Sequence, residues 1–84
     1  MTKIEMKLLL ARYNKLSEER AEAAYMWTLT GESECYEPKW SMCVNEMSKM
    51  RDELRKCGYE FASIGSKVVG KVQHEEYKIV PMNR

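Results

Sequence analysis

The sequence predicts an α+β fold in which a long antiparallel two-helix hairpin precedes a small antiparallel β-meander of two to three short strands. Two observations predict the helices, since apolar residues recur with alternating gaps of 3 and 4 in residues 3–29 and again in residues 38–57. A third observation predicts the meander, since the pattern changes after Gly58 to alternation typical of strands. At 84 residues the chain is expected to form a single domain, 1–84, with the helical hairpin over about 3–57 and the meander over about 59–80.

The first helix is predicted over residues 3–29, a segment without glycine or proline. Its stripe has heptad-like, coiled-coil spacing and consists of Met6, Leu9, Tyr13, Leu16, Arg20, Ala23 and Trp27. Thr2 is a suitable N-cap, and Glu5 three residues later completes a capping box. Gly31 suits the left-handed conformation that ends many helices.

The second helix is predicted from Pro38, whose missing N–H is no loss in a first turn, to Cys57. Its stripe consists of Trp40, Cys43, Met47, Met50, Leu54 and Cys57. Residues 31–37 then form an acidic connection between the helices. Because a short connection implies antiparallel packing, Trp27 and Trp40 are expected to lie together at the connected end.

The meander is predicted as strands over 59–64, 67–73 and 76–80, with turns at 65–66 and 74–75. Phe61, Val69 and Ile79 are the residues expected to face inward, although a register slip of one residue would invert every face. His74 is expected to be a solvated turn residue.

The charge and the cysteine content limit the classes of function that the sequence favours. The net charge of +1 argues against a dedicated nucleic-acid binder, which usually carries a large basic excess. Three cysteines make a poor disulfide framework, and no segment has the pattern of a signal peptide or a membrane span, so we expect free thiols and a cytoplasmic location. Cys43 and Cys57 are expected in the core, and Cys35 on the surface.

No catalytic, cofactor or metal site is predicted. Cys35, Cys43, Cys57 and His74 lack the close spacing of a zinc site. No flanking cation or helix N-terminus activates Cys35 as a nucleophile, and the glycines do not form a phosphate-binding loop. We therefore expect a protein that is not an enzyme.

The connected end of the helices is the predicted partner-binding site. It combines aromatic side chains with a rim of carboxylates, and aromatic residues are over-represented among interface hot spots. The predicted binding residues are Glu32, Glu34, Tyr36, Glu37 and Trp40. Alternatively, Trp27 and Trp40 close the end of the hairpin as core residues.

A basic set offers an alternative site for nucleic acid on the second helix and the strands. Its residues are Arg51, Arg55, Lys56, Lys67 and Lys71. Acidic residues are interleaved with them, and no recognition-helix turn precedes them.

The function expected from the sequence is therefore that of a small non-enzymatic protein-binding regulator or inhibitor. Chains of this kind are frequent among phage and mobile-element accessory proteins, so the expected setting is the host cytoplasm and the expected partner is a host protein. A homodimer is also expected, because so small a core benefits from one. The alternative is a small nucleic-acid-binding regulator.

Overall fold

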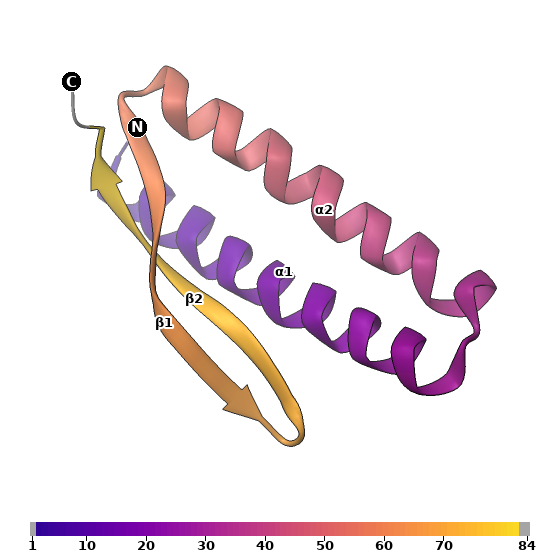
Figure 1. The fold of residues 1–84 in the computed structure, drawn as a ribbon. Coiled ribbons are helices and arrows are strands. Elements are labelled where there is room, and N and C mark those ends of the chain that lie inside the picture. The colour runs from indigo at the N-terminus through magenta and orange to yellow at the C-terminus, as the bar shows by residue number, and fades with distance from the viewer. Residues whose placement is uncertain (1, 83–84) are drawn as a thin grey trace.

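The computed structural model describes residues 2–82 and confirms the α+β architecture. Helix α1 spans Lys3–Thr30 and helix α2 spans Ser33–Lys56, and they are followed by strand β1, Tyr59–Val69, and strand β2, Val72–Pro81. Figure 1 shows the helices side by side and antiparallel, with the β-hairpin lying along α1 and its tip directed away from α2. Neither helix is both long enough and apolar enough to cross a bilayer.

The predicted caps of α1 are confirmed. Thr2 Oγ1 accepts a hydrogen bond from the Glu5 amide at 3.1 Å, and Glu5 Oε1 accepts one from the Thr2 amide at 3.3 Å. The hydrogen bond from Thr2 to the Glu5 side chain lowers the pKa of that carboxyl. At the other end Gly31 has φ of 72° and its amide donates to the Trp27 carbonyl at 2.8 Å.

The predicted start of the second helix at Pro38 is wrong, because α2 begins at Ser33 and only two residues connect the helices. Pro38 lies inside the helix, where its missing N–H leaves the Glu34 carbonyl without the usual bond. Pro38 and Glu34 are both exposed, so water can hydrate that carbonyl. The earlier start places Tyr36 one turn before Trp40, and both side chains are half-buried.

The prediction of a third strand and of a turn at residues 65–66 is also wrong. The sheet has two antiparallel strands, and Gly65 lies inside β1 beside a β-bulge at Ser63/Gly65. The turn is at Gly70-Lys71, flanked by the paired residues Val69 and Val72. Gly70 has φ of 63° at the first central position, where a type II′ turn requires glycine.

The shifted turn changes the inward residues only in part. Phe61 packs on the core as predicted, and its partner across the ladder, Ile79, is half-buried. Val69 faces α1 and lines a pocket there, but it is 42% exposed and does not join the core. It lies next to the hairpin turn, which is beside the C-terminal half of α1.

Tyr13 is the centre of the core. Its ring stacks on Phe61 with centroids 3.7 Å apart, and it meets Tyr77 edge-on at 4.9 Å. Its hydroxyl accepts a hydrogen bond from Arg51 Nη1 at 3.0 Å. One α1 side chain therefore joins both strands and α2. The other buried residues of this cluster are Leu16, Cys43, Met47 and Met50.

Helix α1 also holds the outer edge of β2 through side-chain hydrogen bonds. Asn14 Oδ1 accepts from the Tyr77 amide at 2.8 Å, and Asn14 Nδ2 donates to the Tyr77 carbonyl at 3.2 Å. Ser17 Oγ donates to the Glu75 carbonyl at 2.9 Å. These three bonds satisfy strand groups that would otherwise be open for pairing. We call them the edge clamp.

The stability of the hairpin should fall at alkaline pH. Burial raises the pKa of Tyr77, and the 2.7 Å hydrogen bond from its hydroxyl to Glu75 Oε2 raises it further. Folding then favours the neutral phenol, so this stabilisation is complete below the ordinary tyrosine pKa of about 10 and is lost as the pH rises through the raised value. Urea unfolding from neutral to strongly alkaline pH should show a smaller alkaline loss in Tyr77→Phe than in the unmodified chain. Equal losses would contradict this account.

Candidate functional site

The connected end of the helix pair carries the two tryptophans of the chain. Trp27 lies near the end of α1 and Trp40 near the start of α2, with ring centroids 6.3 Å apart and planes at 71°. Such an edge-to-face pair contributes about 1 kcal/mol beyond its buried area. Both rings are half-buried. They therefore pack on each other and also keep a surface open to solvent.

The acidic residues predicted for this site occupy the first turns of α2 and the residue before them. Glu32 is the N-cap, Glu34 lies in the first turn, and Glu37 follows one turn later. All three are exposed. Negative charge is favourable near a helix N-terminus, which gives Glu32 and Glu34 a local structural role. We call Trp27, Trp40, Tyr36 and these three glutamates the turn-end surface.

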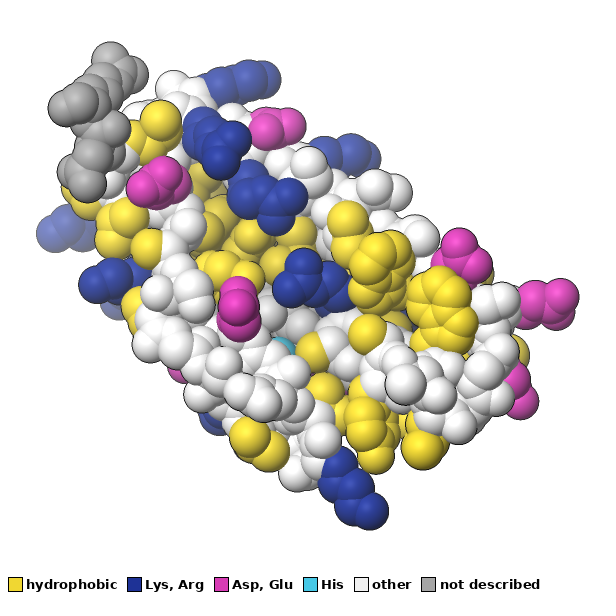
Figure 2. All heavy atoms as spheres, in the orientation of Figure 1, with side chains coloured by type: hydrophobic (Ala, Val, Ile, Leu, Met, Phe, Trp, Pro, Cys, Tyr) yellow, Lys and Arg dark blue, Asp and Glu magenta, His cyan; other side chains and the backbone are white. Residues whose placement is uncertain are grey.

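The space-filling view supports the grouping of these residue types. Figure 2 shows hydrophobic side chains gathered over the two helices near their connection, with acidic side chains beyond them at the connected end of the helix pair. Leu29 in α1 and Met42 in α2 are 65% and 49% exposed. This end of the helix pair thus offers apolar area together with negative charge.

The structure does not bring the predicted basic set together. Arg51 is half-buried and bonded to the Tyr13 hydroxyl, and Lys67 pairs with Glu76 at 3.7 Å. Arg55 and Lys56 lie at the end of α2, where β1 begins, whereas Lys71 lies in the turn at the other end of the hairpin (Figure 1). Eleven strand residues separate these ends, a length of roughly 35 Å when extended.

The three cysteines are free thiols and lie apart. Cys43 is buried and Cys35 is exposed, as predicted, but Cys57 is exposed and its predicted core position is wrong. Cys57 follows the last residue of α2 and acts as its C-cap. Burial, followed by the charge of Glu19, raises the pKa of the Cys43 thiol and so lowers its reactivity. Within residues 2–82 no three or more His, Cys, Asp or Glu side chains are placed to bind a metal ion.

His74 is the feature that the sequence interpretation missed. It was predicted in a solvated turn, but it is buried on β2 with Nδ1 3.2 Å from the Glu75 carbonyl oxygen. Its Nε2 has no hydrogen-bond partner among the described residues. The sequence signal for this position is the alternation of Val72 and His74 along a strand, and a turn predicted at 74–75 is incompatible with it.

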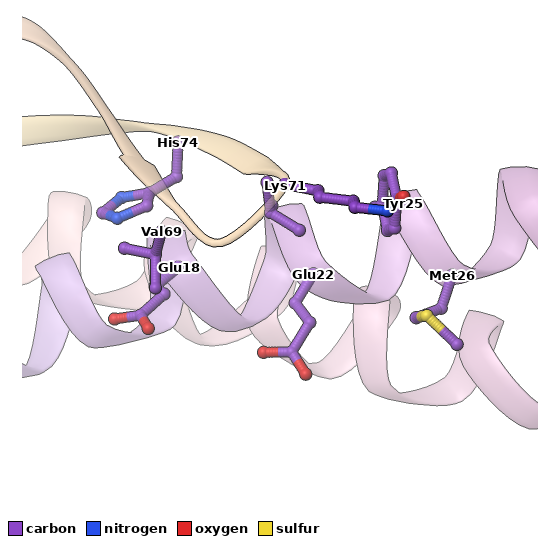
Figure 3. A pocket seen from close by; sticks show the side chains of 8 residues that line it. Glu18, Glu22, Tyr25, Met26, Val69, Lys71 and His74 are labelled. Atoms are coloured by element: carbon purple, nitrogen blue, oxygen red, sulfur yellow. The ribbon is translucent and has the colours of Figure 1, made fainter.

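A pocket of about 270 Å³ lies between the hairpin turn and α1, next to His74. Figure 3 shows Lys71 extending toward Tyr25, while Glu18 and Glu22 project from α1 on the other side. Nε2 of His74 is closed off from solvent, so a molecule in this pocket would not reach it.

The outer edge of β1 is the open edge of the sheet. In an antiparallel pair, residues outside the hydrogen-bonded pairs turn their N–H and C=O groups to the outer edges. Tyr77 and Glu75 turn theirs toward α1, so their ladder partners Ser63 and Ser66 turn theirs away from the hairpin. Every residue of β1 from Ser63 onward is exposed.

Comparison of the chain with protein-family models, curated proteins and solved structures finds no match.

Proposed function

We propose that this chain is a small protein-binding regulator or inhibitor that is not itself an enzyme, and that the turn-end surface binds its target. The observation that carries the proposal is the Trp27–Trp40 pair, which is fixed by edge contact yet still half-exposed. Tryptophan and tyrosine are enriched among hot spots because they provide large contact area at low entropic cost. Rings already held in place lose little further freedom on binding.

The charges around the rings favour one class of target. Glu37 is exposed and makes no ion pair with the residues described, so the folded chain leaves its charge free. Together with Glu32 and Glu34 it makes the rim acidic. The complementary target surface is an apolar pocket rimmed by lysine or arginine, because charge complementarity steers association and disfavours wrong partners.

The proposed setting is the cytoplasm of a host cell, with a host protein as the target. Three free cysteines, of which Cys35 and Cys57 are exposed, are compatible with a reducing compartment. Binding through an exposed aromatic surface would inhibit a target if it covered the functional surface of that target.

The test is capture from the native host lysate with the tagged chain, with and without nuclease, read by mass spectrometry. The decisive variant is Glu34→Lys combined with Glu37→Lys, because both residues are exposed. Loss of the favourable Glu34 charge at the start of α2 should cost about 1 kcal/mol or less, so the fold should remain. Asp52→Lys, an exposed acidic residue in the other half of α2, is the matched control. We expect one dominant protein that survives nuclease, is lost with the double variant and is retained by the control.

Trp40→Ala should also abolish capture, and its circular dichroism must show that the helices remain. A captured protein that binds the double variant and Trp40→Ala as well as the unmodified chain would contradict the proposal. Recovery of nucleic acid, or loss of all partners after nuclease, would favour the alternative that uses Arg51, Arg55, Lys56, Lys67 and Lys71. That alternative also predicts affinity that falls steeply with salt.

A further inference from the structure

The side of α2 that carries Trp40 also carries a carboxylate that the fold does not use. Glu37 and Trp40 are three residues apart, so they lie on the same side of the helix with Cβ atoms about 5–6 Å apart. Glu37 is exposed, and the half-buried Trp40 ring is held in position by its edge-to-face contact with Trp27. Part of an aromatic ring and a carboxylate are therefore held next to each other at the surface.

Neither the helix nor a neighbouring cation gives Glu37 a structural role. Glu32 and Glu34 stand at the N-terminus of α2, where negative charge stabilises the helix, but Glu37 follows the first turn and lies beyond this effect. Glu37 makes no ion pair within residues 2–82. The nearest cation in the sequence, Lys39, is two residues away and so projects from another side of α2. The Glu37 carboxylate is thus free to bind a group from outside the chain.

The chemical group that fits this pair of side chains is a guanidinium. It is planar and weakly hydrated, so it stacks on an aromatic face, and it can donate two parallel hydrogen bonds to one carboxylate. Tryptophan is the best aromatic side chain for such a cation–π contact. A lysine ammonium is compact and strongly hydrated, so it bonds the carboxylate as a point charge and gains less from the ring. The phosphate groups of a nucleic acid would be repelled by the three carboxylates of the turn-end surface.

We propose that the turn-end surface recognises its target through an arginine side chain of that target, whose guanidinium stacks on Trp40 and binds the carboxylate of Glu37. This inference rests on the proposed function and specifies which group of the target is bound. The charge of the surface is complementary to an arginine, because Glu32, Glu34 and Glu37 are all exposed and none is paired within residues 2–82. Arginine and tryptophan are also two of the residues most enriched among interface hot spots.

The test is a titration of the chain with two short peptides of equal charge, one of alternating glycine and arginine and the other of alternating glycine and lysine. Tryptophan fluorescence measures binding, since Trp27 and Trp40 are the only tryptophans of the chain and both lie in the turn-end surface. We expect the arginine peptide to bind about tenfold more tightly than the lysine peptide, because only the guanidinium both stacks on the ring and bonds the carboxylate in a bidentate manner.

Two matched variants separate the Glu37 contact from a general attraction of cationic peptides. Glu37→Gln should weaken binding of the arginine peptide about tenfold, because the charge-assisted bonds are lost. Glu53→Gln removes the same charge from an exposed position in the other half of α2, where salt screens it from the site, and should change the affinity by less than about twofold. Equal affinity for the two peptides, no saturable binding of the arginine peptide, or binding that Glu37→Gln leaves unchanged would overturn the inference.

Capture of the target from lysate distinguishes failure of this inference from failure of the proposed function. Glu37→Gln should weaken capture and Glu53→Gln should not. A target that is lost with Trp40→Ala but fully retained by Glu37→Gln would keep the turn-end surface as the binding site and overturn the arginine contact. A target that both variants retain would overturn the proposed function and this inference with it.

Discussion

Replacement of Tyr13 by alanine is expected to remove most of the protein's free energy of unfolding at 25 °C. The ring is buried between Phe61 and Tyr77, and its removal leaves a cavity where both strands meet α1. Truncation of a buried aromatic residue costs about 3–5 kcal/mol. A domain of this size has a total stability on the order of 5 kcal/mol, so the loss consumes most of it. Circular dichroism during urea unfolding measures the effect.

Tyr13→Phe is the control that separates packing from hydrogen bonding. It keeps both ring contacts and loses only the bond from Arg51 Nη1, which should cost about 1 kcal/mol. Arg51 is only half-buried, so its guanidinium can bind water instead. If the free energy of unfolding of Tyr13→Ala were within about 1 kcal/mol of that of the unmodified chain, Tyr13 would not be the centre of the core.

Removal of the edge clamp is expected to have the next largest effect. Asn14→Ala combined with Ser17→Ala deletes three hydrogen bonds to the backbone of Glu75 and Tyr77. We expect a loss of about 2–4 kcal/mol, since each partly buried backbone group left without a partner costs about 1 kcal/mol or more. The free energy of urea unfolding measures the total. Asn45→Ala, at an exposed position of α2, is the control and should change it by less than about 0.5 kcal/mol.

Amide hydrogen exchange locates the effect of the clamp. The Tyr77 amide bonds to Asn14, so its exchange should accelerate most in the double variant. The Lys78 amide belongs to a residue paired with Ala62 inside the hairpin and should change less. Equal acceleration of the two amides would mean that the hairpin opens as a whole, and that the clamp does not protect the β2 edge locally.

The ends of α1 could be predicted from sequence because their signals are local. Thr2, Glu5 and Gly31 act through bonds within four residues, and each has the predicted role. The start of α2 could not be predicted in this way, because proline suits a first turn but is also tolerated further in when its surroundings are solvated. The half-buried positions of Tyr36 and Trp40 on consecutive turns favour the longer helix.

The position of the hairpin turn was harder to predict, because two glycines in the segment are both suited to a turn. Gly65 and Gly70 both interrupt an alternating pattern, and sequence alone does not say which is the bulge. A turn at Gly65 requires a second turn at His74 and a third strand, and residues 2–82 contain neither. The edge clamp was equally hidden, because Asn14 and Ser17 are ordinary polar residues until β2 is placed beside α1.

The composition of the turn-end surface could be predicted, because antiparallel helices must bring Trp27 and Trp40 to the same end. The exposure of Ile4 and Leu8 could not be predicted from the sequence. Their identities suit a core, and only the folded structure shows that they are 72% and 67% exposed.

The central claim, that the turn-end surface binds a protein target, is tested most directly by fluorine NMR of the chain labelled with fluorotryptophan. Trp27 and Trp40 are the only tryptophans of the chain, and both belong to that surface, so each resonance reports on it. On saturation with the captured target we expect both resonances to shift and to lose their sensitivity to solvent isotope exchange, because the rings lose water. A target that binds fully while both resonances stay unchanged would show that it binds elsewhere on the chain.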